Sequence, residues 1–152
     1  MSSERLEKIF PNLRRSSYRI TSDPTETYNC IAWAAGNTKR WYEPTPDPGC
    51  YWPANVAREY TLEAYTQVYT DCGYVVCHSD EPEPGYEKVA IYVDSYGLPS
   101  HAARLTSSGV WTSKLGELED IEHDTLKALE NSDYGVVARI LKRNLLGKGT
   151  SE

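Results

Sequence analysis

Apolar residues come in short runs separated by turn residues, and the period of each run predicts its structure. The run EKVAIYVD at 87–94 has the two-residue period of a strand, with Val89, Ile91 and Val93 on one face. Residues 101–106 follow after the turn SYGLP and are the expected antiparallel partner. Other β-rich runs that predict strands lie at 17–21, 73–78, 110–115 and 134–143.

Three further segments have the pattern of a helix. CIAWAA at 30–35 is apolar on every side, which predicts a buried central helix with Asn29 as its N-cap and Gly36 near its end. Residues 56–71 form a longer amphipathic candidate, and 117–130 repeats leucine and isoleucine at helical spacing. N-terminal helices packed on a mainly antiparallel sheet are typical of the α+β class.

The breaks in this pattern are loops within one unit rather than linkers between domains. Residues 43–55 hold four prolines, and 79–85 combines two prolines with three acids. Neither is long enough to divide the chain. We therefore expect one domain over 1–152, with a core at about 9–143 and a flexible tail at 147–152.

Composition removes several classes of function. Four Trp and 12 Tyr in 152 residues exclude a fully disordered chain. The net charge of −6 argues against binding nucleic acid or anionic lipid, because both need clustered positive charge. No apolar run is long enough for a membrane span or a signal peptide, which predicts a cytoplasmic protein with reduced thiols. Nothing in the composition sets the oligomeric state.

Cys30 is the strongest candidate for chemistry. It opens the predicted central helix, where the roughly half positive charge of a helix N-terminus stabilises a thiolate. That is the position a nucleophilic cysteine needs. The alternative is that Cys30 packs as one more small apolar residue of a buried helix.

His101 is the natural partner for this thiol. It begins a predicted strand, from which it can reach a helix packed on the sheet and act as general base and then general acid. A third polar group should orient the imidazole, and Ser113 on the next strand and Asp120 both qualify. Asn29 or Thr27 can supply positioning or oxyanion contacts, although Asn29 is equally expected as a plain cap.

His123 and the remaining cysteines invite other interpretations. On a helix over 117–130, His123 would share a face with Asp120, and we expect that face to be polar surface. Cys72, Cys77 and His78 suggest zinc, but the spacing lacks a CxxC pair. We therefore expect no metal and no cofactor, and read Cys50, Cys72 and Cys77 as packing thiols.

Three motifs carry a resemblance to a known family. NCIAWA at 29–34, HAAR at 101–104 and WTSKLG at 111–116 together resemble an uncharacterised bacterial domain family. More distantly, the arrangement is similar to papain-like thiol hydrolases of the cell-wall amidase and peptidase branch. Those enzymes place Cys at the start of a central helix, His on a strand, and a polar residue on the next strand.

The resemblance implies a papain-like fold with Cys30 as nucleophile and His101 as base, and it leaves the third position open between Ser113 and Asp120. The hypothesis is a cysteine-dependent amide hydrolase or acyl transferase acting on a peptide or another amide. The alternative is a non-catalytic binding or immunity-type module that keeps the scaffold and binds a protein partner.

Overall fold

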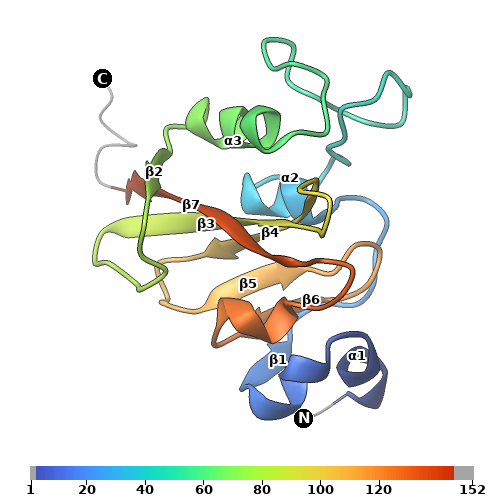
Figure 1. The fold of residues 1–152 in the computed structure, drawn as a ribbon, viewed down its shortest axis with the longest axis vertical. Coiled ribbons are helices and arrows are strands. Elements are labelled where there is room, and N and C mark those ends of the chain that lie inside the picture. The colour runs from blue at the N-terminus through green and yellow to red at the C-terminus, as the bar shows by residue number, and fades with distance from the viewer. Residues whose placement is uncertain (1–2, 146–152) are drawn as a thin grey trace.

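A seven-stranded antiparallel sheet organises the chain. The computed structural model describes residues 3–145, and its strands follow the order β1-β6-β5-β4-β3-β7-β2 (Figure 1). Together with its helices the sheet gives an α+β fold, as the sequence predicts. The strands are β1 (Tyr18–Ile20), β2 (Val75–Cys77), β3 (Tyr86–Val93), β4 (Pro99–Leu105), β5 (Trp111–Lys114), β6 (Asp120–His123) and β7 (Val136–Asn144).

Helices contribute to two separate cores. The helical elements are α1 (Glu4–Ile9), α2 (Cys30–Ala34), α3 (Leu62–Thr70) and the 3₁₀ turns η1 (Pro11–Arg15) and η2 (Leu126–Leu129). Figure 1 shows α2 and α3 together beside β3, β4 and β7, whereas α1 lies near β1 at the opposite end of the molecule. Residues of α2 and α3 form one core, and residues of α1, η1 and η2 form the other.

The alternation of β3 assigns its side chains to these two cores. Val89 and Ile91 face the core of α2 and α3, whereas Ala90 and Tyr92 face the other core. The pairing of β3 with β4 sets Ile91 opposite Ala102 and Tyr92 opposite His101. Adjacent residues of β4 therefore send their side chains to opposite faces of the sheet.

The segment 56–71 forms a shorter helix than its pattern predicts. The Thr61 hydroxyl accepts a hydrogen bond from the Ala64 N–H at 3.1 Å, so the helix begins at Leu62. Val56 lies in the preceding loop and is still buried in the core. Its apolar character reports burial rather than helical structure.

The predicted helix over 117–130 is wrong. Its first part is strand β6, which pairs with β5 on one side and β1 on the other. Its second part is the 3₁₀ turn η2, capped by the Thr125 hydroxyl, which accepts from the Ala128 N–H at 3.2 Å. Two neighbouring strands satisfy the backbone groups of β6, and this tertiary pairing overrides the helical period of the sequence.

The N-terminal elements α1 and η1 have no counterpart among the predicted elements. Leu6, Phe10 and Leu13 from this region are buried in the second core. The predicted tail at 147–152 lies outside the described residues. Within residues 3–145, no helix is long and apolar enough to cross a membrane.

Strands β4 and β5 are paired over only part of their length. The ladder joins Arg104 to Thr112 and Leu105 to Trp111. The N–H of Ala102 lies beyond these two pairs and faces the Cys30 thiol of α2. The start of α2 is thereby seated against the backbone of β4.

The tight turn before β7 yields a stability prediction. Gly135 has φ +73°, and a β-carbon there would lie 1.8 Å from the Val93 carbonyl oxygen. Gly97 has a similar φ of +80°, with nothing within 4 Å. Gly97→Ala should therefore cost about 1–2 kcal/mol from its backbone conformation alone, and Gly135→Ala at least twice as much. Urea unfolding of both variants measures the difference, and equal losses would contradict the close approach at Gly135.

Candidate active site

Asn29 holds the start of α2 in place. Its Oδ1 accepts from the N–H of Ala32 at 3.1 Å, which confirms the predicted N-cap. The same side chain also holds the following loop, because Oδ1 accepts from the Tyr42 N–H at 3.1 Å and Nδ2 donates to the Tyr42 carbonyl at 2.7 Å. Asn29 is 7% exposed and makes these three bonds to the backbone of Ala32 and Tyr42, so its observed role is structural.

Thr27 lies at the surface, two residues before Asn29. Its side chain is exposed, and its hydrogen bonds run to Thr25. With Lys39 and Arg40 it lines a surface groove of about 350 Å³. None of these hydrogen bonds connects Thr27 to Cys30 or His101.

Cys30 is the first residue of α2 and is 8% exposed. It belongs to the same core as Ala34 and Ala102, and its small side chain allows the helix to lie close to β4. Burial raises the pKa of the Cys30 thiol to about 11, although backbone N–H groups led by that of Ala102 favour the thiolate. At neutral pH this cysteine is therefore a thiol.

His101 is completely buried next to the residue that meets Cys30. Its ring Nε2 lies 3.0 Å from Oγ of Ser113. Nδ1 of the same ring has no hydrogen-bond partner in the described structure. No hydrogen bond joins Cys30 to His101, so the predicted pair is adjacent through the backbone of β4 without direct bonding.

Two tyrosines enclose the His101 ring. Tyr134 stacks on it with ring centroids 4.3 Å apart and an interplanar angle of 12°, and Tyr92 meets it edge-on at 5.1 Å. Tyr92 is fully buried, whereas Tyr134 is only half-buried. Tyr134 therefore separates the His101 ring from solvent on this side. The sequence pattern treats it as an ordinary strand residue and carries no signal for this role.

The register of the sheet separates the two candidates for the third residue. Ser113 contacts His101, whereas Asp120 accepts a hydrogen bond from the Tyr28 hydroxyl at 2.6 Å. Asp120 is also the register partner of Lys114 and not the first-turn helix residue that the sequence predicts. Only Ser113 is therefore placed to orient the imidazole.

His123 is not a surface residue, contrary to the sequence prediction. It is fully buried on β6, with Nε2 2.8 Å from Oγ of Ser113 and Nδ1 2.8 Å from the Thr125 carbonyl. Because residues 120 and 123 are three apart on a strand, their side chains point to opposite faces. The predicted shared face of Asp120 and His123 would exist only on a helix.

Both buried histidines are held in the neutral form. Burial lowers the pKa of His101 well below its ordinary value, and the nearby His123 lowers it further. Burial also lowers the pKa of His123 to about 4, despite the opposing effect of its bond to Thr125. A neutral imidazole with a free Nδ1 can accept a proton, which is the chemistry of a general base.

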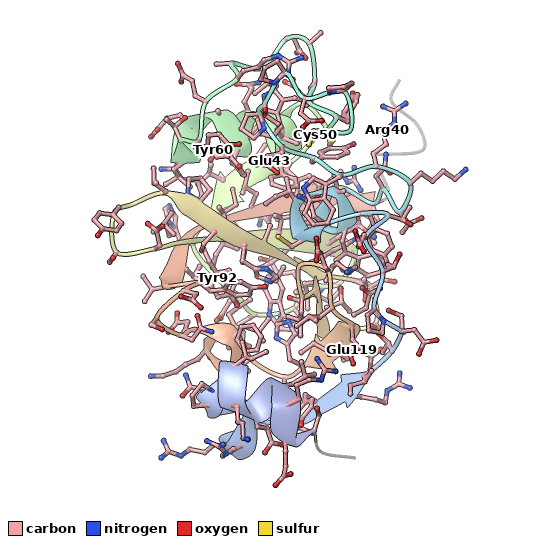
Figure 2. All side chains as sticks on the ribbon, turned by 90° about the vertical axis from the view of Figure 1, so that its right-hand side faces the viewer. Arg40, Glu43, Cys50, Tyr60, Tyr92 and Glu119 are labelled. Atoms are coloured by element: carbon pink, nitrogen blue, oxygen red, sulfur yellow. The ribbon has the colours of Figure 1, made fainter. Side chains whose placement is uncertain are left out.

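The other cysteines lie apart from this site. All four are free thiols, and Cys50 sits among the loops that hold Glu43 and Tyr60, well separated from Tyr92 (Figure 2). In the part of the chain that the structure describes, no three His, Cys, Asp or Glu side chains form a group able to hold a metal ion. Cys72 and Cys77 are accordingly not joined with His78 in such a group.

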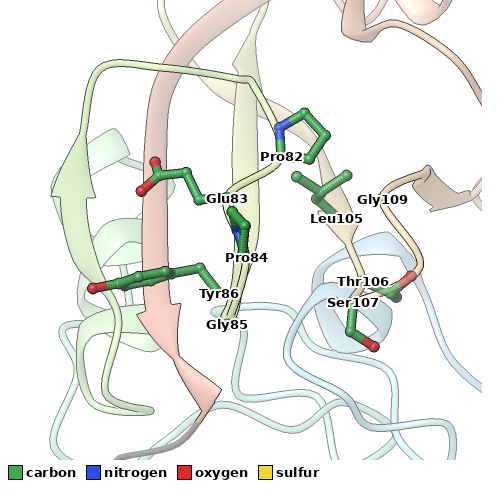
Figure 3. A pocket seen from close by; sticks show the side chains of 9 residues that line it. All are labelled: Pro82, Glu83, Pro84, Gly85, Tyr86, Leu105, Thr106, Ser107 and Gly109. Carbon is green, nitrogen blue, oxygen red and sulfur yellow. The ribbon is translucent and has the colours of Figure 1, made fainter.

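A separate pocket lies at the far end of the central strands. It has a volume of about 280 Å³ and is formed by the turn containing Glu83 and the turn containing Gly109 (Figure 3). Tyr86 and Leu105 lie at this end of β3 and β4, opposite the end that carries His101. The pocket therefore gives no access to the buried histidine.

Comparison with protein families assigns the chain to one of them. A family model described as a domain of unknown function (DUF7689) matches residues 19–142. The chain belongs to this family. The DUF7689 region contains Cys30, His101, Ser113 and His123, in accord with the resemblance to an uncharacterised domain family. No curated protein and no solved structure matches the chain.

The two neutral histidines of the DUF7689 domain predict an acid-sensitive fold. Each should take up a proton only on unfolding as the pH falls below 6.5, so its contribution to stability is present above that pH and is lost as the pH falls. For His123 the loss runs down to about pH 4, where the folded protein also takes up the proton. We expect the free energy of unfolding to fall by up to about 1.4 kcal/mol per pH unit for each histidine. Urea titrations between pH 7.5 and 5 measure this slope.

Matched variants separate the contributions to this slope. His123→Gln should reduce the slope because one of the two buried groups is removed. His78→Gln, at an exposed position, should keep the wild-type profile. A wild-type stability that stays constant from pH 7 to pH 5 would contradict neutral burial of the histidines.

Proposed function

We propose that this domain is a papain-like, cysteine-dependent amide hydrolase or acyl transferase. One observation carries the proposal: a buried imidazole offers an unbonded Nδ1, has its Nε2 engaged by Ser113, and is adjacent in sequence to the amide that faces Cys30. A nucleophile at a helix start, a base on a strand and a polar group on the next strand form a nucleophile–base–orienter set.

The chemistry proceeds in two steps from the neutral pair. The reaction requires Sγ of Cys30 to meet Nδ1 of His101, although the closed structure places the Cys30 core and the His101 ring on opposite faces of β4. When opening of the site brings the two atoms together, Sγ attacks the substrate carbonyl and Nδ1 accepts the thiol proton. The backbone N–H of Cys30 donates to the oxyanion, the C–N bond breaks, and His101 returns the proton to the leaving amine. Water or an acceptor amine then attacks the thioester, which restores the Cys30 thiol and releases the acyl product.

Labelling of the thiol tests this assignment. We expect a panel of peptidyl vinyl sulfones to modify Cys30 of the native protein, as read by intact mass and peptide mapping. Cys30→Ala should abolish the modification, and His101→Gln, which keeps volume but removes the base, should slow it by roughly a hundredfold or more. Cys50→Ala is the matched control and should react like wild type.

Thermal unfolding accompanies each labelling experiment, so that loss of reaction is separated from loss of fold. Equal labelling rates for wild type and His101→Gln would remove His101 from the mechanism. Modification confined to Cys50 and Cys72 would remove Cys30 as the nucleophile.

Access to the pair depends on Tyr134. Its half-buried ring lies on the imidazole, whereas His101 itself has no exposed surface. Tyr134→Ala should therefore increase the labelling rate of Cys30 by removing this ring, and Tyr134→Phe should keep the wild-type rate because it preserves the stacking. A slower reaction in Tyr134→Ala at unchanged stability would show that the ring assists the reaction instead of covering it.

Burial of the pair favours a second candidate, the non-catalytic binding or immunity-type module. Cys30 is 8% exposed and His101 is 0% exposed, and neither lines the pocket beside Glu83 or the surface groove beside Thr27. In that case, Cys30 would react with the panel only after unfolding, at the rate of an unactivated thiol. The same labelling experiment thus separates the two functions.

A further inference from the structure

Four groups form a continuous hydrogen-bonded chain behind His101. It runs from Nε2 of His101 to Oγ of Ser113 at 3.0 Å, and from there to Nε2 of His123 at 2.8 Å. Nδ1 of His123 then lies 2.8 Å from the Thr125 carbonyl oxygen. All three side chains in the chain are 0% exposed, so water does not compete for these bonds.

The carbonyl at the end of the chain fixes the direction of every bond in it. A carbonyl oxygen only accepts, so Nδ1 of His123 carries a hydrogen. A neutral imidazole has one N–H, which leaves Nε2 of His123 as an acceptor and requires the Ser113 hydroxyl to donate to it. That hydroxyl has a single hydrogen, and toward His101 it therefore accepts. Nε2 of His101 carries the hydrogen and Nδ1 carries a lone pair.

This assignment of hydrogens requires both imidazole rings to be neutral, and their buried surroundings favour the neutral form. Burial disfavours the charged form of each ring, and His123 additionally disfavours charge on His101. The unpartnered Nδ1 of His101 agrees with the result, because a buried N–H without an acceptor costs more than an unused lone pair.

We propose that His123 is a positioning residue that fixes, through Ser113, the tautomer of His101 in which Nδ1 is free to accept a proton. Ser113 alone cannot do this, because a hydroxyl donates or accepts equally well. Without an acceptor at position 123, the hydroxyl is free to turn and donate to Nε2 of His101. Either tautomer then leaves one buried hydrogen without an acceptor, so the Nε2–H form is no longer fixed and the Nδ1–H form becomes populated. The hydrogen bonds alone determine the assignment of the tautomer, whereas its role in catalysis rests on the proposed function.

Nitrogen NMR of the histidine rings tests the tautomer directly. In protein labelled with ¹⁵N-histidine at pH 7.5, we expect His101 to carry its hydrogen on Nε2 and His123 on Nδ1. His123→Leu removes the acceptor and should populate the form of His101 that carries its hydrogen on Nδ1. His123→Gln presents a carbonyl oxygen to Ser113 and should restore the Nε2–H form, whereas a merely structural role would not distinguish these two variants by tautomer.

Defined outcomes overturn the proposal. A hydrogen on Nδ1 of His101 in the wild-type protein contradicts it without any variant, which covers the case in which His123→Leu does not fold. Retention of the Nε2–H form in a folded His123→Leu protein contradicts the role of His123.

Labelling of Cys30 provides the second readout. We expect His123→Leu to react more slowly than wild type in proportion to the fraction of the Nε2–H form that it loses, and His123→Gln to recover most of the rate. If the tautomers follow the expectation while native Cys30 of the wild type does not react at all, the proposed hydrolase fails and the positioning role of His123 stands. If Cys30 reacts but the wild-type tautomer is reversed, the positioning role fails alone.

Discussion

Close packing of α2 on β4 is the constraint on which the site depends. Cys30 and Ala34 are one helical turn apart, and both are small enough to let the helix lie near the Ala102 backbone. The helix can approach here because β4 and β5 pair over only two residues, which leaves the Ala102 N–H facing the Cys30 thiol. A larger side chain at any of these three positions would move the helix away and with it the thiol.

The local elements of this arrangement could be predicted, but its burial and register could not. The N-cap at Asn29, the strand around Ile91 and the placement of His101 on the next strand follow from capping preference and period. The choice between Ser113 and Asp120 needed the β5–β6 register. A register is a long-range property, so residue spacing along the chain does not contain it.

The error at 117–130 shows the same limit from the other side. Leu118, Ile121 and Leu126 recur at helical spacing, yet the backbone of β6 is paired on both sides. This mistake also hid His123, because a helix would place it at the surface, whereas a central strand buries it. Assigning a helical period to this segment therefore missed both strand β6 and the buried position of His123.

The buried ammonium group of Lys114 can report local opening of the fold. Lys114 is 0% exposed, and its ammonium donates to the carbonyls of Thr25, Gly116 and Leu118 at 2.5–2.8 Å. These bonds join the segment that precedes Cys30 to the turn between β5 and β6. An amine-reactive reagent can modify Lys114 only when that joint opens. The rate of its modification in mass spectrometric footprinting therefore reports the local breathing of the segment that leads into α2.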